Sequence, residues 1–200
     1  WYNCANFKPL SRKFKPEHAV LFQVKIEYED GTNEMVVSDG GVTVSDSPVR
    51  SSDLFAGELY DARMEQEGWD CPGFDDNSWK AGILSGHDPA NLVAQYGEPV
   101  RPVLELPAVG LTVSPKGETI LDFGQNLAGV LRVKTSLPSG AKIVLDHFET
   151  LDQHGNYFNN IMMAEKIGRT QRDVYISNGK ASFYQPHFTY HGISKMASSI

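Results

Sequence analysis

The segment from 56 to 79, AGELYDARMEQEGWDCPGFDDNSW, concentrates the residue types that could do chemistry. Glycoside hydrolysis uses two carboxylates on either side of the scissile bond, ~5 Å apart for retention and ~6.5 to 9.5 Å apart for inversion. Glu58, Asp61 and Glu65 could supply such a pair. Arg63 lies among them, however, and should keep a neighbouring carboxylate ionised, whereas a general acid must carry a proton. We therefore favour a charge-paired structural loop, with a sugar or cation contact as the first alternative and catalysis as the second.

The two tryptophans of this segment have different expected roles. Trp69 and Trp79 could each stack on the apolar face of a sugar. A Trp that closes a sequence such as GFDDNSW more commonly fills the end of a β-sandwich, while the Asp and Asn side chains before it bond turn amides. We expect Trp79 to belong to the core, and the role of Trp69 stays open between core and sugar contact.

The histidines suggest a metal site only superficially. His187 and His191 have a four-residue spacing, but PHFTYH indicates a strand, in which four residues span ~13 Å. We therefore expect ordinary strand residues here, and the sequence identifies no metal ligands. His147 and Glu149, in DHFETLDQHGNYF, are expected on one face of a strand, and a role at the active site of a neighbouring domain stays open.

The overall charge argues against nucleic acid as a partner. The 200 residues carry a formal net charge of -7, and the 18 Lys and Arg residues are scattered rather than gathered into a basic stripe. No apolar run approaches the ~18 residues of a membrane-spanning helix, and no export signal is visible in WYNCANFKPL. We predict no nucleic-acid partner, no membrane span and a cytoplasmic location.

Several common functional motifs are missing from the sequence. It has no P-loop, no dinucleotide-binding glycine motif, no Gly-x-Ser-x-Gly elbow and no His-Glu-x-x-His helix. Nucleotide binding and serine hydrolysis therefore lose their usual support. Cys4 and Cys71 are the only cysteines, so a disulfide framework is excluded. Two free thiols are favoured over one bridge.

Short strand patterns recur along the chain. Residues 20–28, VLFQVKIEY, alternate between apolar and polar and predict a half-buried strand. The Asp30-Gly31 pair then predicts a tight hairpin into TNEMVV, because Gly accepts a positive φ. Further strand signals are GVTV at 41, LTV at 111, TILDF at 119, GVLRVKT at 129, AKIVLDHF at 141, DVYIS at 173 and SFYQPHFTY at 182. The helical candidates, 89–97 and 160–167, are too short to organise a fold.

These patterns predict an all-β fold with two antiparallel, jelly-roll-like β-sandwich domains and few short helices. The stretch around 83–102 is rich in Gly and Pro with little alternation, which is typical of a linker. We therefore expect a first sandwich over 1–82, a linker over 83–102 and a second sandwich over 103–200.

Five segments, taken in order, resemble the N-terminal region of bacterial α-L-rhamnosidases. They are SSDLFAGELYDARMEQEGWDCPGFDDNSW, LVAQYGEPVRPV, DFGQNLAGVLRV, FETLDQHGNYF and YQPHFTYHG. The resemblance implies a galactose-binding-like first sandwich and a concanavalin-like second one, followed in the family by an (α/α)₆ barrel. That barrel removes terminal α-L-rhamnose with inversion and carries the acid and base. Nothing in this chain corresponds to it, so the resemblance implies a non-catalytic accessory fragment.

Two departures from the family pattern bear on this interpretation. After FTYHG the family continues with an aromatic, apolar strand, whereas this chain reads ISKMASSI. The first sandwich of the family also begins well before the WY that opens this sequence. We therefore expect missing strands in domain one and an unpaired edge that favours a homodimer.

The resemblance also implies that a module of this kind holds rhamnose with help from calcium. Glu58, Tyr60, Asp61, Arg63 and Trp69 are our candidate sugar- or cation-binding residues, because they combine oxygen ligands, hydrogen-bond donors and a stacking surface. No cofactor is required by this interpretation, and calcium is the one candidate. Two alternatives stay open: a free-standing carbohydrate-binding module and a scaffold that only assembles.

Overall fold

A computed structural model describes residues 19–54, 56–86, 88, 90, 92–159 and 171–199. Its regular structure is almost entirely β-strand, with one 3₁₀ turn, η1 (Ala62–Met64), so the predicted all-β class is confirmed. The helix predicted over 160–167 lies outside the described residues, and residues 92–96 have no regular secondary structure. Within the described part, no helix is long and apolar enough to cross a membrane.

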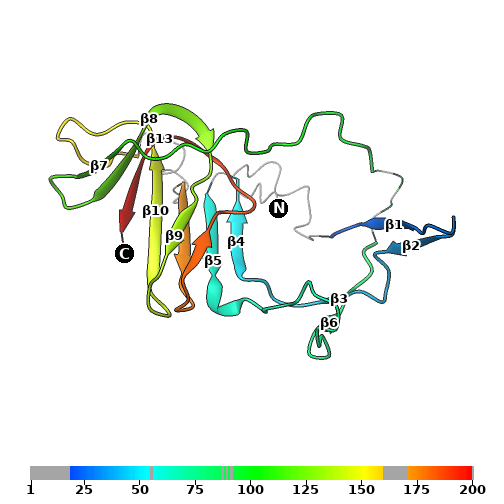
Figure 1. Cartoon of the computed structure of the whole chain (residues 1–200). Coiled ribbons are helices and arrows are strands. Elements are labelled where there is room, and N and C mark those ends of the chain that lie inside the picture. Colours follow the sequence, from blue (N-terminus) through cyan, green and yellow to red (C-terminus); the bar gives the residue numbers. More distant parts are fainter. Residues whose placement is uncertain are drawn as a thin grey trace. The chain divides into compact units, whose positions relative to one another are not determined.

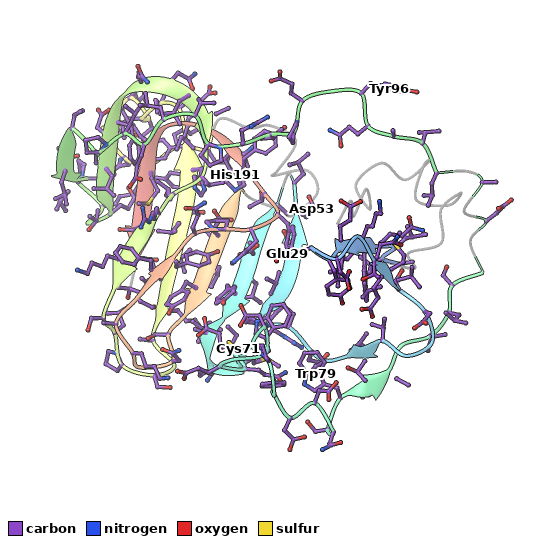
Figure 2. The ribbon with its side chains drawn as sticks, turned by 45° about the vertical axis from the view of Figure 1, so that its right-hand side comes forward. Glu29, Asp53, Cys71, Trp79, Tyr96 and His191 are labelled. Atoms are coloured by element: carbon purple, nitrogen blue, oxygen red, sulfur yellow. The ribbon has the colours of Figure 1, made fainter. Side chains whose placement is uncertain are left out.

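The chain divides into two compact units that differ from the predicted division. Residues 47–65 group with the chain from 101 onward, and residues 19–46 form a smaller unit with the described residues between 66 and 100. Between 83 and 102, the described residues contain no strand. Tyr96 projects from this segment and is 96% exposed (Figure 2).

The smaller unit contains the predicted hairpin. β1 (Gln23–Glu27) pairs antiparallel with β2 (Asn33–Val37). The turn has Gly31 at φ 84°, and Asp30 Oδ1 accepts a hydrogen bond from the Thr32 amide at 2.9 Å, as the Asp-Gly pair predicted. The sequence predicted that the apolar face of β1 would be buried, but Val24 on this face is 49% exposed.

A second short pair and an aromatic contact complete the smaller unit. β3 (Thr43–Val44) pairs antiparallel with β6 (Lys80–Ala81). Trp79 is partly buried, packs edge-on against Phe74 with ring centroids 5.7 Å apart, and donates from Nε1 to Gln66 Oε1 at 2.8 Å. Trp79 therefore packs against other residues of the smaller unit, in agreement with the core position that the sequence predicted.

The larger unit is built on a seven-stranded sheet of order β4-β5-β11-β10-β13-β8-β7 (Figure 1). Its strands are β4 (Val49–Asp53), β5 (Gly57–Asp61), β7 (Gly110–Val113), β8 (Thr119–Gly129), β10 (Lys142–Phe148), β11 (Arg172–Ile176) and β13 (His191–Ser199). A separate pair, β9 (Val133–Thr135) with β12 (Ser182–Tyr184), packs on one face. Neighbouring strands are antiparallel except β5 and β11, which run parallel and so depart from the predicted antiparallel arrangement.

Alternation along the central strand β10 produces two cores. Leu145 faces the covering pair β9–β12, and we call this side the inner face, whereas Phe148 points to the opposite side. Both side chains are essentially fully buried. The inner core contains Ala62, Leu131, Ile143, Leu145, Tyr175, Tyr184, Ile193 and Met196. The smaller outer core contains Ile120, Phe148 and Ala197.

Three strands of this sheet were not predicted from the sequence. β4 and β5 were assigned to a first sandwich over 1–82, but they extend the sheet formed by the second half of the chain. β13, which begins at His191 and includes most of the ISKMASSI segment, lies between β10 and β8. A register shift between Ile193 and Lys195 breaks its alternation, which explains why the period-2 pattern is absent there.

Gly57 at the start of β5 should be irreplaceable. Its φ is +92°, and an added Cβ would overlap the backbone carbonyl of Arg172, lying 2.6 Å from the carbonyl carbon. Gly57→Ala should therefore lower the free energy of unfolding by roughly 3 to 5 kcal/mol, from the combined backbone strain and steric overlap. Urea denaturation of the purified chain measures this loss.

Gly117→Ala is the matched control in the same unit. Gly117 has a similar φ of +85°, but nothing lies within 4 Å of its added Cβ. Its substitution should lower the free energy of unfolding by only about 1 to 2 kcal/mol, from backbone strain alone. Equal losses for the two variants would contradict the close approach of β5 to β11.

Candidate functional site

The inner face of the sheet carries a cluster of buried polar side chains. Strand alternation places Glu58 of β5, Asp173 of β11 and His147 of β10 on the same face as the inner core. His191, at the start of β13, joins them. All four residues are at most 1% exposed. Charged side chains are almost never this buried unless they are paired, so their partners define what the cluster does.

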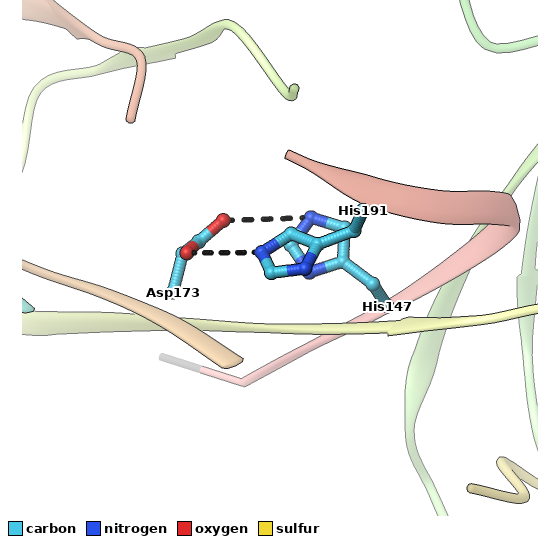
Figure 3. A group of neighbouring side chains, drawn as sticks. All are labelled: His147, Asp173 and His191. Carbon is cyan, nitrogen blue, oxygen red and sulfur yellow. Dashed lines mark hydrogen bonds and ion pairs between the residues drawn. The ribbon is translucent and has the colours of Figure 1, made fainter. Parts of the chain in front are cut away.

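Asp173 is at the centre of this cluster (Figure 3). Its Oδ1 accepts a hydrogen bond from the Glu58 amide at 2.9 Å and lies 3.4 Å from His191 Nε2. Its Oδ2 lies 3.6 Å from His147 Nε2. That separation is too long for a hydrogen bond, and neither of these two atoms has a hydrogen-bond partner.

His147 is oriented by the backbone on its other side. Its Nδ1 lies 3.3 Å from the Gln171 carbonyl oxygen, which can only accept, so Nδ1 carries the proton. Burial, helped by the nearby His191, lowers the pKa of His147 to about 4. At neutral pH the ring is therefore uncharged, and the Nε2 lone pair faces the unpartnered Asp173 oxygen.

Glu58 belongs to a second, adjoining network. Its Oε2 accepts a hydrogen bond from the His187 amide at 2.9 Å, and its Oε1 contacts His187 Nδ1 at 3.3 Å and the Tyr184 hydroxyl at 3.4 Å. The hydrogen bond to Glu58 raises the pKa of His187 above its ordinary value. Glu58 is thus fully engaged inside the protein.

Tyr60 fills the space beside this network. Its ring stacks on Tyr175 at 6.0 Å and on His187 at 5.5 Å, both with an interplanar angle of 12°. Its hydroxyl donates to Glu65 at 2.7 Å. Burial, with this hydrogen bond second, raises the pKa of Tyr60 well above its ordinary value.

Asp61 and Arg63 form the charge-paired loop that the sequence predicted. Arg63 donates from Nε and Nη2 to the two Asp61 oxygens at 2.8 and 2.7 Å. These bonds hold the pKa of Asp61 below its ordinary value. Asp61 also accepts from the Arg63 amide and thereby caps η1.

The five candidate residues have different surroundings within their own units. Glu58 and Tyr60 share the buried network, and Asp61 pairs with Arg63. Trp69 is 62% exposed and belongs to the smaller unit. That these five residues bind a sugar or a cation stays a prediction.

The proximity of His147, Asp173 and His191 was not predicted, because these residues lie far apart in sequence. His187 contacts Glu58 whereas His191 contacts Asp173, and the strand that PHFTYH predicted is wrong, because residues 185–190 contain no strand. His147 is buried while Glu149 is exposed beyond the end of β10, so the predicted shared strand face is wrong. The available signal was a polar residue at an inward position of two apolar strands, Asp173 in DVYIS and His147 in AKIVLDHF.

A cavity of about 250 Å³ lies elsewhere on the inner face. Its lining includes Leu121, Val133, Leu137, Ile143, Leu145 and Met196, and contains no carboxylate. A cavity lined in this way cannot provide the two acids that hydrolyse a glycosidic bond.

Family models match this chain in two consecutive parts. The α-L-rhamnosidase N-terminal domain matches residues 1–103, and the bacterial α-L-rhamnosidase concanavalin-like domain matches residues 112–194. The chain belongs to the α-L-rhamnosidase family. The resemblance seen in the sequence is thereby confirmed.

Individual α-L-rhamnosidases agree with this assignment. The chain is 39% identical to one from Streptomyces avermitilis and 31% identical to one from Alteromonas sp., over 96% of its own length in both cases. It spans only 18% and 21% of these two relatives. It therefore corresponds to a small, N-terminal part of such enzymes.

Solved structures of α-L-rhamnosidases share the fold. The Streptomyces avermitilis enzyme complexed with L-rhamnose superimposes with a TM-score of 0.82 at 37% identity, covering 90% of this chain and 17% of that one. The native Aspergillus terreus enzyme gives 0.81 at 30% identity, with 90% and 20% covered.

The pairing of His187 with Glu58 makes a testable prediction about this rhamnosidase segment. Because the folded pKa of His187 is raised, the pair contributes stability that is fully present below about pH 6.5 and is lost as the pH rises through the folded value. NMR titration of the His187 ring should give a pKa above 6.5 in the parent chain and a lower one in Glu58→Gln.

Glu65→Gln is the control for this titration. Glu65 contacts Tyr60 and Asn178 rather than His187, so its substitution should leave the His187 titration unchanged. A His187 pKa that does not respond to Glu58→Gln would show that the contact with Glu58 is not formed.

Proposed function

We propose that this chain serves as a non-catalytic β-sandwich support within an α-L-rhamnosidase, an enzyme that hydrolyses terminal α-L-rhamnose from glycosides. The observation that carries the proposal is the match to two successive accessory domains over a chain that spans about a fifth of its relatives. In this proposal, the residues that cleave the bond belong to the remainder of such an enzyme.

The buried carboxylates support this division of roles. A general acid or nucleophile must reach the scissile bond, but Glu58 and Asp173 are essentially inaccessible. Glu58 holds His187 and Tyr184, and Asp173 accepts the Glu58 amide. Asp61 is held ionised by Arg63, which is the wrong protonation state for a general acid. These side chains stabilise a fold rather than a transition state.

Incubation with 4-nitrophenyl α-L-rhamnoside tests the proposal. The purified chain should release no more nitrophenol than the substrate alone, because Glu58 and Asp61 are engaged in structural contacts and Asp173 is buried. Sustained turnover that disappears in Glu58→Gln or Asp173→Asn would overturn the proposal and place an active site inside this chain.

A second candidate function is carbohydrate binding by the smaller unit. The large exposed surface of Trp69 favours it, since an exposed indole ring offers a stacking surface for the apolar face of a sugar. The exposed carboxylate of Asp70 follows it in the chain and could assist a sugar hydroxyl or a calcium ion. L-Rhamnose is the sugar to test, in keeping with the family.

Titration calorimetry with L-rhamnose, with and without a calcium chelator, measures this binding. Trp69→Ala should weaken it by up to about tenfold, the equivalent of losing one aromatic contact. Tyr96→Ala, which removes another exposed aromatic ring of the same unit, should leave it unchanged. Heat indistinguishable from dilution at millimolar sugar would eliminate this function.

A further inference from the structure

We propose that His147, Asp173 and His191 form a structural binding site for one divalent transition-metal ion of the zinc class. The three residues come from β10, β11 and β13, and each offers one ligand atom, with these atoms within 4.8 Å of one another. Two imidazole nitrogens and one carboxylate oxygen form a ligand set that zinc prefers, whereas calcium requires six to eight oxygens.

The distances within the cluster fit an ion better than they fit hydrogen bonds. The separations from His191 Nε2 to Asp173 Oδ1 and from His147 Nε2 to Asp173 Oδ2 are 3.4 and 3.6 Å. Direct N–H···O bonds are usually ~2.7 to 3.2 Å long. Two ligands on a tetrahedral ion with bonds of ~2.0 to 2.1 Å lie ~3.3 to 3.5 Å apart. Because each residue offers one ligand atom and these atoms lie within 4.8 Å of one another, the more widely separated atoms would have to approach each other to bind one ion.

Unpartnered atoms indicate that something positive belongs between these side chains. His147 Nε2 and Asp173 Oδ2 are fully buried, and neither has a hydrogen-bond partner. Since His147 Nδ1 donates to Gln171, the Nε2 lone pair faces a carboxylate oxygen. Two buried acceptors that face each other are unfavourable, and a bound cation would satisfy both.

The surroundings resemble the outer shell of a metal site. Metal-ligating histidines usually donate their other ring N–H to a carbonyl or carboxylate, as His147 does to Gln171. Asp173 is fixed in turn by the Glu58 amide. His191 Nε2 also lies 3.4 Å from Thr189 Oγ1, and its Nδ1, which would carry the proton, has no partner.

The position of the site suggests what the ion does. β11, β10 and β13 are adjacent in the sheet, and β5 is attached through the Glu58 amide on Asp173. An ion at this point would cross-link β10, β11 and β13 directly, and β5 through the hydrogen bond from the Glu58 amide. The site lies on the inner face, remote from solvent, which is typical of a structural rather than a catalytic metal.

The test is metal binding by the 200-residue chain carrying Cys4→Ser and Cys71→Ser, which removes thiol ligands. Because the three donors are buried, the chain is refolded with zinc chloride and then dialysed. Elemental analysis should find about one zinc per chain, and the thermal midpoint should rise relative to the chain refolded with a chelator. X-ray absorption should show imidazole nitrogen among the zinc ligands.

Substitutions assign the ion to this cluster. Asp173→Asn and His147→Asn should each weaken zinc binding by more than the roughly 100-fold that loss of an outer-shell partner produces. His154→Asn removes an exposed histidine outside the cluster and should bind zinc like the parent chain. Circular dichroism checks that the variants fold. If they do not, the X-ray absorption spectrum of the zinc-loaded parent chain still tests the site.

Two results would overturn the proposal. One is a folded parent chain that retains no zinc and has the same thermal midpoint with zinc and with chelator. The other is retained zinc whose absorption spectrum lacks imidazole, or whose affinity is unchanged in Asp173→Asn. Neither result bears on rhamnoside hydrolysis, so the proposed function is tested separately.

Discussion

The parallel pairing of β5 with β11 is the interaction on which the larger unit depends. It joins residues 57–61 to a sheet whose other strands, apart from β4, come from the second half of the chain. The pairing is reinforced by the bond from the Glu58 amide to Asp173 and by the stacking of Tyr60 on Tyr175. Gly57 allows the strand to approach, because any side chain there would meet the Arg172 carbonyl. Residues 57–61, which belong to the segment that most resembles an active site in the sequence, are therefore part of the sheet.

This arrangement brings ionisable groups into a core, which constrains everything around them. A buried carboxylate without partners costs several kcal/mol, so each one must be satisfied. Glu58 meets this requirement with His187 and Tyr184. Asp173 meets it only in part, and its remaining oxygen faces an uncharged His147. The two carboxylates therefore differ: both Glu58 oxygens have partners, whereas Asp173 keeps one oxygen without a hydrogen-bond partner.

Much of the fold could be predicted from sequence where local patterns agree with tertiary structure. The Asp30-Gly31 hairpin and the strands at 119–123 and 141–148 were found because alternation and turn chemistry are local. The all-β class followed from them, whereas the family was identified from the resemblance of five sequence segments. The pairing of Asp61 with Arg63 was also predictable, since the two residues are close in sequence.

The remainder could not be predicted because tertiary context overrides the local pattern. β5 contains the buried polar residues Glu58 and Asp61, so its sequence resembles that of a polar loop. β4 is a serine-containing edge strand with no apolar alternation. In β13 a register shift hides the alternation. His147, Asp173 and His191 meet only when three separate strands pair, and no spacing rule connects them.

Native-state hydrogen exchange under increasing denaturant tests the central claim that residues 49–61 belong to the sheet of the second half. Amides of 49–61 should open with the same free energy and denaturant dependence as those of 142–148 and 172–176, while the hairpin at 23–37 opens separately. Exchange of 49–61 together with 23–37, while 142–148 stays protected, would contradict it.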